Sequence, residues 1–236
     1  MPDVDAAPRS EESRAVVYTT LAAGQDLRTE LEIKRSRFIT VLRRTETEAA
    51  ARDLVAGLRR EFHDARHHCS AFILGPDRSV QRSNDDGEPS GTAGIPMLEA
   101  LSRRETTAGV TDLSDVTAVV VRYFGGILLG AGGLVRAYSE SVSTALDAAP
   151  LVHRTRLRIC AAEVPHAQAG RLENELRSAG FVMADTSYGA QSTVLRLALP
   201  DAPDTISAAA DRLLSLTAGA TLLKPEGTEW VDVPIS

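Results

Sequence analysis

Apolar and polar positions divide the first 150 residues into strand and helix patterns. Period-two alternation and short apolar runs predict strands, whereas apolar residues three and four apart predict amphipathic helices. Thr45 and Glu48 have the spacing of a capping box at the first helix. Strands are expected at 16–22, 31–42, 67–75 and 115–124. Helices are expected at 45–63, 97–107 and 134–150.

The remaining third of the chain predicts a different order of strands and helices. It predicts a strand, a helix, two strands around the Tyr188-Gly189 turn, a second helix and a last strand. This β-α-β-β-α-β order is the ferredoxin-like pattern. The boundary is placed near Pro150, which predicts an N-terminal domain over 16–150 and a C-terminal domain over 151–236. Residues 1–15, acidic and low in apolar residues, are expected to form a disordered tail.

Composition narrows the class of protein. The 236 residues are 43% hydrophobic, and the net charge of −6 argues against tight non-specific binding to DNA. No apolar run approaches the roughly 18 residues of a membrane helix, and the acidic N-terminus lacks a signal-peptide pattern. Cys69 and Cys160 form no spaced motif and are interpreted as reduced thiols. We expect a soluble, cytoplasmic protein without a membrane partner.

A glycine-rich segment, RYFGGILLGAGGLVRAYS at 122–139, lies between a predicted buried strand and a helix. Backbone N–H groups and the helix dipole can bind an anion at such a junction. The glycines could instead permit a tight corner against the neighbouring strand, and the spacing matches no standard nucleotide motif. The candidate anion-binding residues are Arg66, His67, His68, Arg122, Gly125, Gly126, Gly130, Gly132, Gly133 and Arg136.

The polar stretch SNDDGEPSGTAGIP at 83–96 offers a second set of candidates. Asp85, Asp86 and Glu88 could hold Mg²⁺ together with a substrate phosphate, or bond to local backbone N–H groups as turn residues. Ser90 and Thr92 add hydroxyl groups to the same loop. No nucleophile elbow accompanies them. We assign no catalytic residue, no resident metal and no cofactor.

Four blocks identify a resemblance: RSRFI (35–39), ARHHCSAFILG (65–75), NDDGEPSGTAGIP (84–96) and RYFGGILLGAGGLVRAYS (122–139). Their order and spacing resemble the IMPACT family, whose bacterial members include YigZ. The resemblance implies an α+β protein. Its N-terminal domain would be similar to domain 2 of ribosomal protein S5, with helices on one face of a four-stranded sheet. A ferredoxin-like C-terminal domain would follow.

The resemblance also implies an association with translational control. We therefore expect a non-enzymatic regulatory or binding factor whose partner is RNA, the ribosome or a translation-associated protein. The alternative is a magnesium-dependent enzyme acting on a phosphorylated small molecule or nucleotide, with Arg122 and Arg136 neutralising phosphate.

The first strand of the C-terminal domain predicts a row of arginines. Arg154, Arg156 and Arg158 should share one face, with Leu157 and Ile159 facing the helices. The row could attract RNA phosphate or be an ordinary solvated face.

Overall fold

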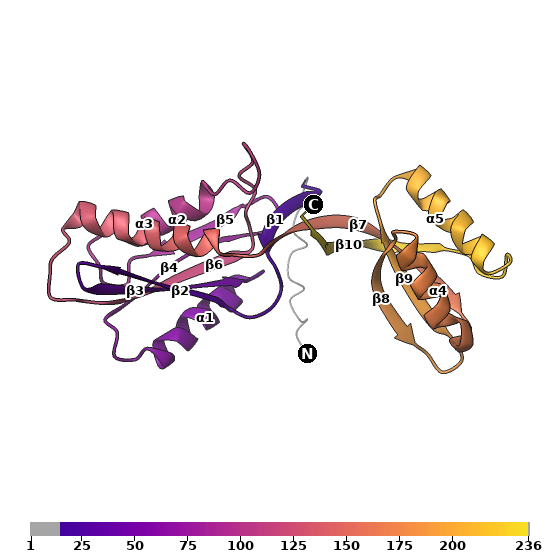
Figure 1. Ribbon diagram of the computed structural model, residues 1–236, viewed down its shortest axis with the longest axis horizontal. Coiled ribbons are helices and arrows are strands. Elements are labelled where there is room, and N and C mark those ends of the chain that lie inside the picture. Colours follow the sequence, from indigo (N-terminus) through magenta and orange to yellow (C-terminus); the bar gives the residue numbers. More distant parts are fainter. Residues whose placement is uncertain (1–14, 236) are drawn as a thin grey trace, which may run out of the picture. The chain divides into compact units, whose positions relative to one another are not determined.

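The computed structural model describes residues 15–235, which fall into two compact units (Figure 1). One unit runs to His153 and includes Pro234, and the other spans Arg154–Val233. Both combine helices with sheets, which confirms the α+β class. The elements to Asp147 are β1 (Val17–Leu21), β2 (Leu27–Ile33), β3 (Ser36–Arg44), α1 (Glu48–Glu61), β4 (His67–Leu74), β5 (Val80–Asn84), α2 (Gly94–Ser102), β6 (Val116–Tyr123) and α3 (Ala131–Asp147). The later elements are β7 (Leu151–Val164), α4 (His166–Ser178), β8 (Val182–Tyr188), β9 (Thr193–Leu199), α5 (Pro203–Leu216) and β10 (Lys224–Pro234).

The first unit is built on an antiparallel sheet with strand order β2-β3-β6-β4-β5. Val41 and Val119 pack with Leu54 of α1 on one face. Val120 packs with Tyr138 of α3 on the opposite face, which α2 also covers (Figure 1). The expected four-stranded sheet with helices on one face was therefore wrong. The buried apolar run of β6 explains the difference, because a strand that is apolar at successive positions needs a cover on both faces.

The segment 31–42, predicted as one strand, belongs to two strands joined by a tight turn. Lys34 and Arg35 form this turn with φ of 48° and 64°, and Ile33 pairs with Ser36 across it. Positive φ at both central positions matches the type of turn that joins antiparallel strands in two residues. Glycine and asparagine usually supply that conformation, so two basic residues gave no turn signal.

The start of α1 also differs from the prediction. Thr47, rather than Thr45, is the N-cap, and its hydroxyl accepts a hydrogen bond from the Ala50 N–H at 3.1 Å. Thr45 is buried, and its hydroxyl lies 2.6 Å from that of Thr117. The capping-box spacing was misleading because β3 continues to Arg44 before the chain turns into the helix.

The second unit has the strand order β10-β7-β9-β8, with α4 and α5 packed against one face. This is the expected ferredoxin-like arrangement. Leu157 and Ile159 do not face the helices, however, and cluster on the other face with Ala198, Val231 and Val233. The helix-facing core on β7 begins only at Cys160, because this 14-residue strand extends beyond the helices.

The arginines of β7 do not form an unpaired row. Arg154 donates to Asp232 at 3.0 Å, and Arg158 donates two hydrogen bonds to Asp201 at 2.9 and 2.8 Å. A guanidinium group already held by a carboxylate is less available to phosphate. The row therefore carries no argument for RNA binding.

The N-terminus of α2 is organised by a carboxylate eight residues before its N-cap, Ala93. Asp85 accepts hydrogen bonds from the backbone N–H groups of Gly91, Ala93 and Gly94 at 2.7, 3.0 and 2.7 Å. Partial burial opposes ionisation of Asp85, but the three donors outweigh it and lower its pKa. Asp85 therefore stabilises the folded loop as a carboxylate.

Replacing Asp85 with Asn should lower the free energy of unfolding at pH 7 by about 1.5–3 kcal/mol, the usual range for hydrogen bonds to a charged group. Because the folded pKa is lowered, this contribution is present above the unfolded pKa of about 3.9 and is lost as pH falls through the folded value. Urea unfolding followed by circular dichroism at pH 7 and pH 3 measures the difference. If D85N lowered the free energy of unfolding by the same amount at both pH values, the result would contradict this role.

Candidate functional site

A buried ion pair joins the acidic loop to the glycine-rich segment. The Arg122 guanidinium at the end of β6 donates to Glu88 Oε1 at 2.5 Å, and the two side chains are only 7% and 4% exposed. The Tyr138 hydroxyl on α3 donates to the same oxygen at 2.8 Å. The two loops singled out in the sequence therefore meet in one place.

Aromatic rings complete the surroundings of Arg122. Its guanidinium carbon lies 5.5 Å from the ring centre of Phe38 and 5.8 Å from that of Phe124. Phe38 pairs with Arg122 across β3 and β6, and its ring meets Tyr138 edge to face at 5.3 Å. Cation–π contacts of this kind stabilise a cation that has been withdrawn from water. The surroundings therefore hold Arg122 in a fixed position.

A cavity of about 330 Å³ opens beside this ion pair. Its wall is mainly apolar, with Phe124, Leu128, Leu129 and Leu134 contributing together with Pro89. It also contains the predicted residues Arg66, His67, Glu88, Arg122 and Gly130. The remaining candidates, His68, Gly125, Gly126, Gly132, Gly133, Arg136, Asp85, Asp86, Ser90 and Thr92, do not line it.

Gly125 shows why this corner requires glycine. A Cβ atom there would lie 2.0 Å from the carbonyl carbon of Arg35, far inside contact distance. The Gly125 N–H donates to the Ser36 hydroxyl at 3.2 Å, which fixes the corner to the turn between β2 and β3. Gly130, at φ 73°, precedes α3 and lines the cavity. The glycine segment therefore serves packing at one point and borders a cavity at another.

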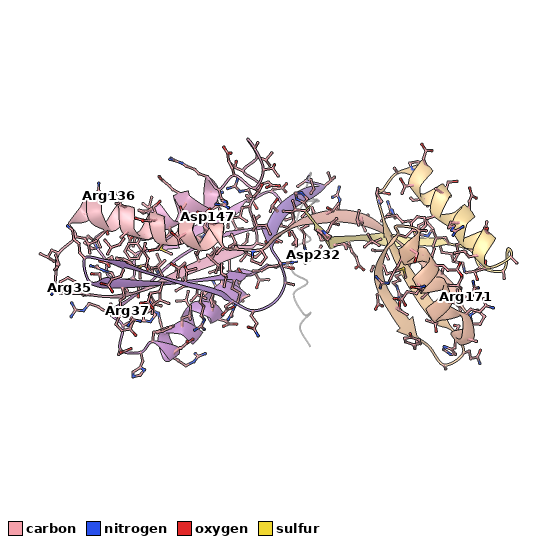
Figure 2. All side chains as sticks on the ribbon, in the orientation of Figure 1. Arg35, Arg37, Arg136, Asp147, Arg171 and Asp232 are labelled. Carbon is pink, nitrogen blue, oxygen red and sulfur yellow. The ribbon has the colours of Figure 1, made fainter. Side chains whose placement is uncertain are left out.

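Exposed side chains lie at the cavity and elsewhere at this end of the first unit. Phe124 and Leu128 are 53% and 83% exposed. Lys34, Arg35, Arg66 and Arg136 are exposed cations for which the described residues supply no carboxylate partner. Arg35 and Arg136 lie at the same end of the first unit (Figure 2). We call residues 34–36, 66–67 and 124–136 the glycine-loop end.

The carboxylates of the acidic loop bind separate groups. Asp86 accepts from the His68 N–H at 2.6 Å and pairs with Arg59, while Asp85 binds the start of α2 and Glu88 binds Arg122. In residues 15–235, no group of three or more His, Cys, Asp or Glu side chains is placed to hold a metal ion. The turn interpretation fits Asp85, which accepts from local backbone N–H groups, but not Asp86, whose side chain binds the backbone of β4 and Arg59. The three carboxylates do not converge as a magnesium site would require.

The other polar candidates also have local roles. His68 is buried, which lowers its pKa, and its Nε2 lies 3.1 Å from the Phe62 carbonyl oxygen. Burial raises the pKa of the Cys69 thiol to about 12, which leaves it protonated and unreactive at neutral pH. The Thr92 hydroxyl donates to the Pro89 carbonyl at 2.6 Å, and Ser90 is exposed.

Sequence reasoning missed the apolar and aromatic part of the site. Phe124 and Leu128 lie within the glycine-rich segment, but only its glycines and arginines were interpreted. The signal that could have found them is the run FGGILLG, where large apolar residues stand in a segment too rich in glycine for a buried strand or helix. Tyr138 gave no such signal, because it has the spacing of an ordinary core residue in α3.

Comparisons with known proteins identify the family. Residues 34–146 match the Impact N-terminal domain, and residues 163–220 match a domain of unknown function, DUF1949. IMPACT family member YvyE of Bacillus subtilis is 43% identical over 171 residues, which cover 72% of this chain and 74% of YvyE. The chain belongs to the IMPACT family. The IMPACT family member YigZ of Escherichia coli is also 43% identical, over 72% of this chain and 81% of YigZ.

A solved structure supports the architecture of this IMPACT family protein. A crystal structure described as that of a hypothetical protein is 37% identical, covers 88% of this chain and 96% of its own, and superposes with a TM-score of 0.55. Among the helices that the structure describes, none is both long and apolar enough to cross a membrane.

Substituting Gly125 with Ala should destabilise the first unit by about 1–3 kcal/mol, the usual range for overpacking, because backbone atoms of Arg35 would have to move. Gly132→Ala is the matched control, since a Cβ there meets open space and alanine favours a helix. Amide hydrogen exchange in β6 measures the stability of this unit. Equal protection in the two variants would contradict the close approach at Gly125.

Proposed function

We propose that this IMPACT family protein is a non-enzymatic binding factor linked to translation. Its glycine-loop end would contact RNA on the ribosome, which also requires the cytoplasmic location predicted from the sequence. The observation that carries the proposal is a set of exposed cations, without carboxylate partners among the described residues, at the end of the first unit that carries the half-exposed ring of Phe124. These cations are Lys34, Arg35, Arg66 and Arg136.

Electrostatics favour phosphate as the group recognised here. Most arginines in residues 15–235 are held in ion pairs, as Arg28 is with Glu61 and Arg43 with Asp26. The cations of the glycine-loop end have no such partner within residues 15–235, so their binding to phosphate breaks none of these ion pairs and releases counterions from the RNA. The guanidinium fork suits phosphate, and an exposed aromatic ring can stack on an unpaired base.

The acidic loop supports binding rather than catalysis. Asp85, Asp86 and Glu88 each hold a different structural group, as the hydrogen bonds of the site show. A magnesium-dependent phosphoryl site would need such carboxylates to converge on one cation. The link to translation rests on the family resemblance and on a domain type that also occurs in ribosomal proteins, which is an argument by analogy.

The variant K34Q/R35Q/R66Q/R136Q should bind bacterial ribosomal subunits and a structured ribosomal RNA fragment more weakly than the unaltered protein. Each cation that contacts phosphate contributes roughly 0.7–0.9 to the slope of log affinity against log salt, so the slope should fall by about 3. Fluorescence anisotropy over a series of potassium chloride concentrations gives both quantities.

The matched control is R60Q/R103Q/R212Q/K224Q, which removes the same charge from other exposed positions. It should retain the slope of the unaltered protein. Equal losses in the two variants would show that only net charge matters. Ribosome binding that survives ribonuclease treatment, without binding to isolated RNA, would replace the RNA partner with a protein.

A further inference from the structure

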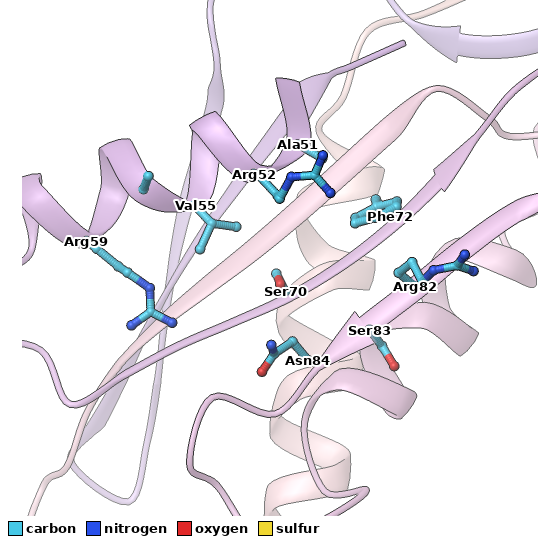
Figure 3. A pocket seen from close by; sticks show the side chains of 10 residues that line it. Ala51, Arg52, Val55, Arg59, Ser70, Phe72, Arg82, Ser83 and Asn84 are labelled. Carbon is cyan, nitrogen blue, oxygen red and sulfur yellow. The ribbon is translucent and has the colours of Figure 1, made fainter. Parts of the chain in front are cut away.

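A second cavity lies between α1 and the strands β4 and β5 (Figure 3). Its volume is about 370 Å³, within the range of small-ligand sites. Phe72 and Ser70 alternate along β4 with Ala71 and Ile73, which belong to the core beneath α2 and α3. This cavity therefore opens on one face of the sheet, and the cavity beside Glu88 and Arg122 opens on the opposite face. We call it the α1–β5 groove.

The floor of the groove is set by strand register. Ser70 pairs with Asn84, and Phe72 pairs with Arg82, so all four side chains stand on the face toward α1. Helix α1 packs on β4 and β6, whereas β5 is an edge strand exposed along most of its length. The helix thus forms one wall and leaves the side over β5 open.

The charge of the groove is positive. Among the residues that the structure describes, its lining includes Arg52, Arg59 and Arg82 and no carboxylate, although Asp86 outside the lining pairs with Arg59. Arg52 and Arg59 extend from α1 toward the strands (Figure 3). Arg52 is 3.4 Å from Glu48 in an exposed pair that contributes little, so it can turn to another anion. An occupant of this groove should therefore be anionic.

The remaining lining residues favour a ligand with a flat ring and polar atoms at the edge of that ring. The ring of Phe72 is half-buried on the floor, and Val55 stands on the helix wall. The Ser70 hydroxyl makes no side-chain hydrogen bond to the described residues, whereas the Ser83 side chain stands on the other face, since Ser83 pairs with Ala71. The Asn84 carbonyl oxygen accepts from the Asp86 N–H at 2.7 Å, which leaves the amide N–H groups of Asn84 as donors.

We propose that the α1–β5 groove binds a nucleotide, with the base on Phe72 and the phosphate on Arg52 and Arg82, because Arg59 is already held by Asp86. The hydroxyl and amide groups of the floor would contact the base edge or the ribose. A free mononucleotide and an unpaired nucleotide of an RNA share this chemistry. The site is independent of the glycine-loop end, because the two lie on opposite faces of the sheet and share no lining residue.

The test is isothermal titration of the full chain with AMP, adenosine, inorganic phosphate and a five-residue oligoadenylate. The informative variants are Phe72→Leu, which keeps an apolar floor but removes the ring, and Arg52→Gln, which removes one cation. Arg60→Gln is the control, because Arg60 is an exposed residue of the same helix outside the groove. Circular dichroism of each variant verifies folding.

We expect AMP to bind, with adenosine and phosphate each binding at least tenfold more weakly. F72L and R52Q should each weaken the binding of AMP about tenfold, and R60Q should leave the AMP affinity unchanged. Binding of the oligonucleotide but not AMP, with the same losses in F72L and R52Q, would identify RNA as the source of the nucleotide. Binding of neither ligand, equal binding by all variants, or phosphate binding as tight as AMP would overturn the proposal.

The glycine-loop variant K34Q/R35Q/R66Q/R136Q separates this proposal from the function proposed above. It should bind AMP as the unaltered protein does. An equal loss of AMP binding in that variant would move the nucleotide site to the glycine-loop end and overturn the assignment to the groove.

Discussion

The ion pair between Glu88 and Arg122 is the interaction on which the first unit's functional surface depends. It joins the loop before α2 to the C-terminal end of strand β6, and through the Tyr138 hydroxyl it also holds α3. Removing one partner of a buried pair leaves an uncompensated charge away from water, which commonly costs about 3–5 kcal/mol. Two loops distant in sequence are thereby held together, and the cavity at the glycine-loop end exists because they meet.

The acidic loop also connects the two faces of the sheet. Asn84 contributes to the α1–β5 groove, and Glu88 contributes to the cavity on the other face. Between them, Asp85 binds the start of α2 and Asp86 binds the His68 backbone and Arg59 of α1. These carboxylates resemble metal ligands in the sequence, but in the structure their hydrogen bonds and ion pairs hold the loop against its neighbours. The same loop brings polar groups to both surfaces that we propose as binding sites.

Much of the fold could be predicted from local patterns, and the errors have specific causes. The apolar strand β6 and the ferredoxin-like order of the second unit could be predicted because the hydrophobic periodicity and the turn residues indicated the same elements. The turn at Lys34-Arg35 was missed because neither residue signals positive φ, and β5 was missed because an exposed polar edge strand has no apolar face. At the site, the meeting of Glu88 with Arg122 depends on a strand order that no local pattern contains.

A double-mutant cycle on Glu88→Gln and Arg122→Met tests the central role of the ion pair most directly. Glutamine keeps an acceptor for Tyr138, and methionine keeps apolar volume near Phe38. The account predicts that each single variant lowers the free energy of unfolding by about 3–5 kcal/mol and that the double variant recovers most of this loss. Additive losses, or single losses below about 1 kcal/mol, would show that the pair does not hold the two loops together.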